Sequence, residues 1–356
     1  MNTIKAGIIG FGYMGHFHLN KARQLEELDV VSAYDIDAEK RADAANEGLT
    51  VYDTLESFLA DETISLVFIC TPNNVHAELA IASLQAGKHV MCEKPMAINA
   101  EEAKKMVDAA KRTGKKLTIG YQNRQRNDSL FAKAEVEAGT LGEIYYARAT
   151  ALRRRAVPTW GVFLNEYEQG GGPLIDIGTH ALDLTLWCMN NYKPKYCVGS
   201  VYKKLGKKFP TGNAWGDWTE EQFTVEDSAF GFIVMENGAT INLESSWALN
   251  MLDTREAVTT LCGTDGGLDM NDGIRINGIR HGRQYVLKPD LSAGGVAFYE
   301  GSNGAKPEDR EAALWIDAVV NDKPPFVLPE QAYAVSQILE GIYISAKTGE
   351  PYYFNK

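Results

Sequence analysis

The sequence has little of what marks secreted or membrane-spanning proteins. Its 356 residues include five cysteines, an odd number without a closely spaced pair, so no disulfide framework or thiolate metal site is expected. No apolar run approaches the roughly 20 residues that cross a bilayer, and no signal peptide is apparent. These absences predict a cytoplasmic protein.

Positive charge is also scarce. The chain has 36 Lys and Arg against 47 Asp and Glu, a net charge of -11. Because nucleic acids and anionic membranes attract basic surfaces, neither is expected as a partner. A hydrophobic content of 45% is typical of globular proteins, and the length suits two domains.

What the sequence does contain is a glycine motif in a complete local context. The apolar run Ile4–Ile9 leads into the motif Gly10–Gly15, a helical pattern follows, and a second apolar run ends at Asp35. Strand, G-x-G-x-x-G and helix form the dinucleotide-binding fingerprint, whose glycines allow a tight turn, close approach to the pyrophosphate and close packing. A carboxylate at Asp35 would bind the ribose hydroxyls and repel a 2′-phosphate, which favours NAD over NADP. A helix cap at Asp35 or Asp37 is compatible with that role.

Strand and helix patterns alternate as far as Tyr121, which predicts a doubly wound parallel sheet. The carboxyl ends of its strands share one edge, where ligands bind. Three loops are expected to leave that edge, and the third carries Glu93-Lys94-Pro95. The residues expected to bind the cofactor are Gly10, Phe11, Gly12, Tyr13, Met14, Gly15, Asp35, Ile36, Thr71, Pro72, Asn73, His76, Glu93 and Lys94.

The second half changes to short strands and tight turns. Glu236-Asn237-Gly238 is typical of a hairpin turn, and alternating patterns indicate a mainly antiparallel sheet. Helices are expected near Leu174–Cys188, Arg310–Val320 and Pro329–Lys347, and two long irregular stretches at Leu205–Gln222 and Lys288–Asp309. The predicted fold is α/β. It has an NAD-binding Rossmann domain at residues 1–121 and an α+β domain with an open sheet, for substrate binding and oligomerisation, at residues 122–356.

Three residues are candidates for catalysis. Lys94 ends a buried strand at the cofactor edge, although a surface salt bridge is the alternative reading. Asp176 and His180 lie four apart in a predicted helix and share a face, with Asp183 one turn further. A neutral histidine oriented by a carboxylate can accept a proton from an alcohol near neutral pH. A buried structural histidine is the alternative for His180. No metal-ligand spacing is evident, so no metal is expected.

Together these motifs resemble the Gfo/Idh/MocA family of NAD(P)-dependent sugar and inositol oxidoreductases. The resemblance implies that Lys94 is the catalytic lysine and that Asp176 and His180 form the acid/base pair. It also implies a cis Lys94–Pro95 bond and dimers or tetramers built on the open sheet. It runs nearly end to end, through Gly10–Gly15 with His18, Cys70–Asn73 with His76, Ala86–Pro95, Gly120–Arg124, Gly139–Ile144, Asp176–His180 and Ala346–Pro351.

The leading hypothesis is an NAD-dependent dehydrogenase that oxidises a ring hydroxyl of a pyranose, glycoside or inositol, with C3 of glycosides as one candidate position. His180 would take the hydroxyl proton, and cationic Lys94 would stabilise the developing alkoxide. A redox-neutral glycosidase that uses bound NAD, and a non-enzymatic sugar sensor, remain alternatives. For Arg153–Arg155, a solvated strand end is the alternative reading. The candidate substrate contacts are Tyr121, Asn123, Arg153, Trp160, Asp176 and His180.

The pattern of the second sheet also bears on assembly. Ala229–Met235 carries apolar residues on both faces, whereas Thr240–Trp247 is apolar on one face only. A large exposed apolar patch is usually an interface, and two-fold pairing is the commonest closure. The sequence therefore predicts a homodimer or homotetramer packed sheet against sheet.

Overall fold

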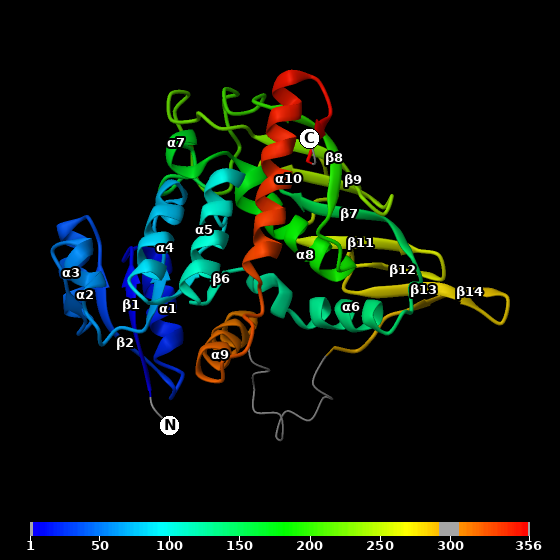
Figure 1. The fold of residues 1–356 in the computed structure, drawn as a ribbon. Helices are drawn as coiled ribbons and strands as arrows, with labels where there is room; N and C mark the ends of the chain where they lie inside the picture. Colours follow the sequence, from blue (N-terminus) through cyan, green and yellow to red (C-terminus); the bar gives the residue numbers. More distant parts are fainter. Residues whose placement is uncertain (1–2, 292–305, 355–356) are drawn as a thin grey trace. The chain divides into compact units, whose positions relative to one another are not determined.

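The computed structural model describes residues 3–291 and 306–354, and it divides into two compact units. The first contains residues up to Gly120 together with Glu308–Tyr333, and the second contains Tyr121–Pro307 together with the residues from Ala334. The chain therefore enters each unit twice (Figure 1). No helix in the described ranges is both long and apolar enough to cross a membrane.

In its described part, the first unit is a six-stranded parallel sheet with helices on its faces. The strands lie in the order β3-β2-β1-β4-β5-β6, and all their pairings are parallel. The chain reverses its direction of strand addition between β1 and β4, and ligands of such sheets bind at this switch point. Helices α4 and α5 pack side by side. The strands are β1 (Ile4–Ile9), β2 (Leu28–Tyr34), β3 (Thr50–Val51), β4 (Leu66–Ile69), β5 (His89–Cys92) and β6 (Leu117–Ile119), and the helices are α1 (Tyr13–Ala22), α2 (Ala38–Asn46), α3 (Leu55–Leu59), α4 (His76–Gln85) and α5 (Ala100–Thr113).

Helix α9 (Pro307–Val320) corrects the predicted domain division. The sequence placed all residues from 122 to 356 in one domain, but Glu308–Tyr333 clusters with the first unit. The physical reason is burial: Trp315 and Ile316 are 2% and 4% exposed in the same apolar core as Leu28. Lys21 of α1 also donates to the Asp309 carboxylate at 2.7 Å.

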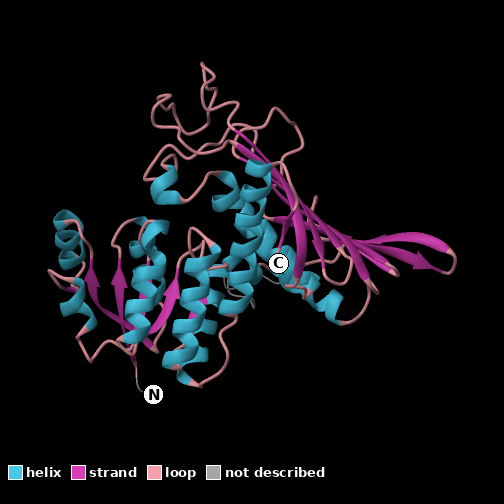
Figure 2. Cartoon of the chain, turned by 45° about the horizontal axis from the view of Figure 1, so that its top comes forward, coloured by secondary structure: helices cyan, strands magenta, loops and turns pink. Residues whose placement is uncertain are grey.

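The described part of the second unit is a nine-stranded sheet of order β14-β13-β12-β11-β7-β10-β9-β8-β15. The pairing of β10 with β7 is parallel and the other pairings are antiparallel, as the short turns predict. At one edge the sheet continues into the long hairpin β13–β14 (Figure 2). The strands are β7 (Ile144–Leu152), β8 (Pro194–Tyr202), β9 (Ser228–Met235), β10 (Thr240–Ser246), β11 (Val258–Gly263), β12 (Gly266–Asp269), β13 (Arg275–Arg280), β14 (Arg283–Leu287) and β15 (Tyr352–Tyr353).

The two faces of this sheet differ in burial. Ile241 and Leu243 of β10 are 0% and 1% exposed, on the face covered by helices. Helix α10 (Pro329–Thr348) approaches so closely that a Cβ on Gly199 would lie 2.4 Å from the Ile342 carbonyl oxygen. On the other face, Val198 and Phe232 are each 42% exposed. The remaining helices of this unit are α6 (Asn127–Glu137), α7 (Glu166–Gln169) and α8 (Thr179–Met189).

The predicted irregular stretches have different outcomes. Residues 205–222 contain no helix or strand, as expected. In the stretch predicted at 288–309, residues 292–305 lie outside the described residues, and α9 begins at Pro307.

A buried ion pair fixes α8 in the second unit. Arg124 donates to both carboxylate oxygens of Asp183, at 2.9 and 2.6 Å, and the two side chains are 0% and 1% exposed. Asp183, predicted to share a face with Asp176 and His180, therefore stabilises the core through this ion pair. Because an unpaired charge in the interior is costly, loss of either partner is expected to destabilise the fold.

We predict that Asp183→Ala lowers the free energy of unfolding of the second unit by about 3–5 kcal/mol, because it leaves the Arg124 charge buried without its counter-ion. Urea denaturation followed by tryptophan fluorescence would measure this. Asp108→Ala is the matched control, since it breaks the half-exposed Lys104–Asp108 pair, worth about 0.5 kcal/mol or less. Equal losses for the two variants would contradict the assignment.

Candidate active site

The glycine motif forms a turn that only glycine permits at two positions. Gly10 has φ +90, and a Cβ there would lie 2.8 Å from the Cys70 carbonyl. A Cβ on Gly15 would lie 2.5 Å from the Gly10 carbonyl oxygen, whereas a Cβ on Gly12 would meet nothing within 4 Å. Gly12 thus faces open space at the N-terminus of α1, whose free N–H groups favour an anion. This cradle fits the pyrophosphate of a dinucleotide.

Asp35 lies beside this turn and is held by it. Its Oδ2 accepts a hydrogen bond from Phe11 N at 2.7 Å, and its Oδ1 accepts one from Asp37 N at 2.9 Å. The cap of α2 is Asp37, whose carboxylate accepts from Glu39 N. Since a carboxylate offers about four acceptor positions, Asp35 keeps capacity for ribose hydroxyls. Ile36 and Tyr13 are 88% and 84% exposed, whereas Phe11 is buried.

The next loop at this edge corrects the prediction for His76. Its ring is 0% exposed, with Nδ1 2.8 Å from the Pro95 carbonyl oxygen and Nε2 3.0 Å from that of Thr71. A ring enclosed in this way offers no surface to a cofactor. His76 instead joins the loop Thr71–Asn73 to the loop that carries Lys94, and it acts on the cofactor edge by positioning both.

The Glu93 carboxylate is also held by hydrogen bonds within the protein. Its Oε1 lies 2.7 Å from His18 Nε2, and its Oε2 accepts from Lys94 N at 3.3 Å. Burial raises the pKa of Glu93, but these partners outweigh burial and hold the pKa below its ordinary value. An ionised carboxylate therefore lies at the base of the Lys94 loop. The Lys94–Pro95 bond is cis, as predicted.

In the second unit, Asp176 and His180 follow a glycine run and start a helix of unusual geometry. Residues Leu174–Gly178 form a π-helical turn that leads into α8, a feature common at functional sites. Glu226 holds its start: its carboxylate accepts from Gly172 N at 2.7 Å, Leu174 N at 3.1 Å and the Tyr343 hydroxyl at 2.8 Å. Burial raises the pKa of Glu226, although these donors oppose it.

The Asp176 carboxylate is fixed by groups distant in sequence. Trp247 Nε1 donates to its Oδ2 at 2.9 Å, and Arg153 Nη1 lies 4.0 Å from the same oxygen. Arg153 is itself clamped by Glu256, with two N–H···O contacts of 2.6 Å. With its side chain 17% exposed, Arg153 is not a solvated strand end, whereas Arg154 is exposed.

The other predicted substrate contacts are placed unequally. Tyr121 is 1% exposed, its hydroxyl lies 3.0 Å from Thr179 Oγ1, and its ring is 6.3 Å from that of His180. This burial leaves the Tyr121 side chain no surface for a substrate, so the structure corrects the prediction that it is a substrate contact. Asn123 and His180 are half-buried, and Trp160 is 52% exposed.

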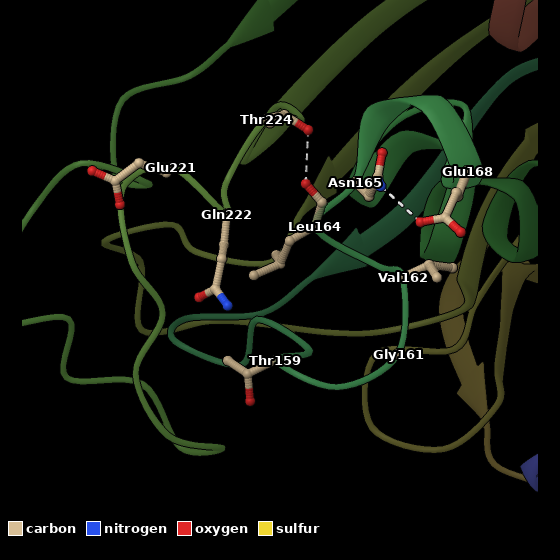
Figure 3. Close-up of a pocket in the computed structure, with 9 residues that line it drawn as sticks. All are labelled: Thr159, Gly161, Val162, Leu164, Asn165, Glu168, Glu221, Gln222 and Thr224. Carbon is tan, nitrogen blue, oxygen red and sulfur yellow. Dashed lines mark hydrogen bonds between the residues drawn. The ribbon is translucent and has the colours of Figure 1, made fainter.

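The second unit also has a cavity of about 330 Å³ between residues 159–168 and 221–224 (Figure 3). Its rim is held by the Asn165–Glu168 contact and by Thr224, which donates to the Leu164 carbonyl oxygen. The predicted substrate contacts are not among the residues that line it, which are Thr159, Gly161, Val162, Leu164, Asn165, Glu168, Glu221, Gln222 and Thr224.

The parallel sheet, the cradle at Gly12 and the carboxylate of Asp35 define the first unit as a dinucleotide-binding Rossmann domain. A model described as "Oxidoreductase family, NAD-binding Rossmann fold" matches residues 4–121, and the GFO/IDH/MocA C-terminal domain matches residues 130–269. The chain belongs to the Gfo/Idh/MocA family.

Several relatives are named as dehydrogenases of sugars or inositol. D-Glucoside 3-dehydrogenase of Escherichia coli (strain K12) is 32% identical over 355 residues, 98% of this chain and 97% of its own length. Inositol 2-dehydrogenase of Salmonella agona (strain SL483) is 30% identical over 198 residues, 54% of this chain and 56% of its own. A solved levoglucosan dehydrogenase, in complex with NADH and levoglucosan, matches with a TM-score of 0.82 at 22% identity over 100% of both chains, which shows the shared fold.

We predict that the protein binds NAD at least about tenfold more tightly than NADP, because a 2′-phosphate would meet the fixed Asp35 carboxylate. Asp35→Ser should narrow this gap, and Asp53→Ser, which removes a carboxylate that is 97% exposed, should not. Titration of both cofactors by calorimetry would measure the ratio. Equal affinities in the unmutated protein would refute the role of Asp35.

Proposed function

We propose that the protein is an NAD-dependent dehydrogenase that oxidises a ring hydroxyl of a pyranose, glycoside or inositol to the ketone. The observation that carries the proposal is the Asp176–His180 segment, where a half-buried histidine follows a carboxylate that Trp247 and Arg153 hold in place. A fixed carboxylate and a neutral imidazole form a general base suited to an alcohol proton. Lys94, at the cofactor edge of the first unit, provides the complementary positive charge.

In this mechanism His180 accepts the hydroxyl proton while the C–H bond of the same carbon breaks. Bound NAD supplies the acceptor for the hydride. Lys94 stabilises the negative charge that develops on the oxygen. Asp176 orients the imidazole or binds a neighbouring hydroxyl of the ring.

The substrate class rests on the relatives. The Escherichia coli relative is named for oxidation of D-glucosides at position 3 and aligns with nearly all of this chain. C3 of a glucoside is therefore the first position to test, and inositols are the second, since another relative is an inositol 2-dehydrogenase. Lys94, Asp176 and His180 are an acid/base set that a sensor does not need, which favours an enzyme.

A panel of methyl glucosides, free hexoses and inositols with NAD would test the reaction and its residues together. We expect reduction of NAD, seen at the nicotinamide absorbance, and a keto product by mass. Lys94→Ala and His180→Ala should each lower kcat by about 10²-fold or more with NAD affinity nearly unchanged. Lys105→Ala, in a half-exposed surface pair, is the control.

Three other outcomes have distinct meanings. Bond cleavage without net NADH would favour the redox-neutral glycosidase. Loss of NAD affinity in Lys94→Ala would make Lys94 a cofactor contact, and full activity of His180→Ala would place the base elsewhere. Binding without turnover of any substrate would favour the sensor.

We further propose that the exposed sheet face of the second unit forms a homodimer or homotetramer interface. Val198, Phe232 and Tyr202 are 42%, 42% and 40% exposed there, around a shallow cavity of about 320 Å³. Phe232→Glu should shift the mass measured by light scattering towards the monomer, whereas Tyr167→Glu, on the exposed helix α7, should not. A monomeric mass for the unmutated protein at micromolar concentration would overturn the interface.

A further inference from the structure

Two half-exposed tryptophans form an aromatic corner in the second unit. Trp160 and Trp215 are 52% and 42% exposed, and their ring centroids lie 5.1 Å apart with the planes at 65°. Exposed indoles are unusual because the ring is largely apolar. At this distance and angle the two indoles form a T-shaped pair, and both keep a large part of their surface exposed.

Hydrogen bonds to backbone groups hold the two segments of the corner together. Trp215 lies in the irregular stretch 205–222, which is bonded to residues 155–159. Asn213 bonds to both Val157 N and Val157 O, at 2.8 and 3.0 Å, and Ala214 N donates to the Arg155 carbonyl oxygen at 3.0 Å. Thr159 Oγ1 donates to the Trp215 carbonyl oxygen at 2.6 Å. A pre-positioned apolar surface loses little freedom when a ligand binds.

Two side-chain paths join this corner to Asp176. The Arg153 guanidinium lies 5.1 Å above the Trp215 ring, and its Nη1 lies 4.0 Å from Asp176 Oδ2. On the other side, the Phe163 ring is 6.0 Å from Trp160 and 6.4 Å from Trp247, the residue that donates to Asp176. One side chain, Arg153, thus separates the corner from Asp176 on the first path, and two, Phe163 and Trp247, separate it on the second.

Because of that separation, the corner is not the part of the site where the oxidised sugar ring would lie. A hydroxyl that meets Asp176 and His180 belongs to one ring, and Arg153, which contacts both Asp176 and Trp215, lies between that ring and the corner. The guanidinium cannot turn toward a ligand, since Glu256 holds it at two nitrogens. It serves as a flat wall on which an indole already stacks.

We propose that the Trp160–Trp215 corner is a subsite for the aglycone ring of a glycoside. This inference rests on the proposed function, because it takes the oxidised sugar to lie at Asp176 and His180. The apolar face of a second pyranose or of an aryl group stacks on the indoles. The preferred substrates are therefore glycosides with a cyclic aglycone, ahead of methyl glycosides and free monosaccharides.

The test compares kcat/KM for phenyl and methyl glucoside. In Trp160→Ala and Trp215→Ala we expect the phenyl-to-methyl ratio to fall about tenfold, mainly through KM, because the lost contact is apolar ring surface. Trp215→Phe should restore part of the ratio. Phe209→Ala is the matched control, since Phe209 is 53% exposed in the same stretch, and it should leave the ratio unchanged.

Binding measured without turnover separates failure of this inference from failure of the proposed function. Quenching of tryptophan fluorescence by phenyl glucoside, with methyl glucoside as reference, should be lost in the double variant Trp160→Ala/Trp215→Ala. Preferential binding without oxidation would refute the reaction and keep the subsite. An unchanged ratio, equal losses on both glucosides, or a drop in oligomer mass in the double variant would overturn the subsite, the last by making the corner an interface.

Discussion

The buried carboxylate of Glu226 determines where the helix of the candidate site begins. The glycine run before that helix has no side chains with which to anchor itself, and Glu226 supplies the anchor by accepting two backbone N–H groups and the Tyr343 hydroxyl. At the other end of the segment, Arg124 holds Asp183. Asp176 and His180 thus lie between two buried carboxylates, each satisfied by several donors. Such satisfaction makes buried polar groups rigid.

Much of the fold follows from local signals in the sequence. Helix α5 is one case, because Asn99 caps it by accepting from Glu102 N and Gly114 ends it at φ +68. Strand β5 is another, because its apolar run ends just before Glu93-Lys94-Pro95. Both elements combine clear periodicity with strong stop signals. In such places local propensity and tertiary packing agree.

Other elements lack such signals. Strands β12, β13 and β14 contain Gly, Asn and Arg, which have little intrinsic preference for strands, and they form because each pairs with its neighbour. The place of α9 was missed for a similar reason, since its pattern shows an apolar face but not which core the face meets. Long-range packing settles both cases.

The candidate site was also predictable from the sequence only in part. The loops at the carboxyl edge of the parallel sheet were predictable, because topology alone brings them together. The partners of Asp176 were not, since Trp247 lies 71 positions away in the chain and read only as a core residue of its strand. His76 was misassigned because its loop was right but its ring turns inward, and a sequence does not show which way a ring turns.

The double entry of the chain into its first unit also bears on biosynthesis. The residues up to Gly120 leave the ribosome first, yet Trp315 and Ile316 complete their core only after nearly all of the second unit has been made. Domains usually fold in the order of their synthesis. Here the core of the N-terminal sheet stays incomplete, with apolar surface exposed, until Trp315 and Ile316 have been made. The nascent chain of this protein therefore keeps apolar surface of its first unit exposed until α9 has been made, and such exposed surface favours aggregation.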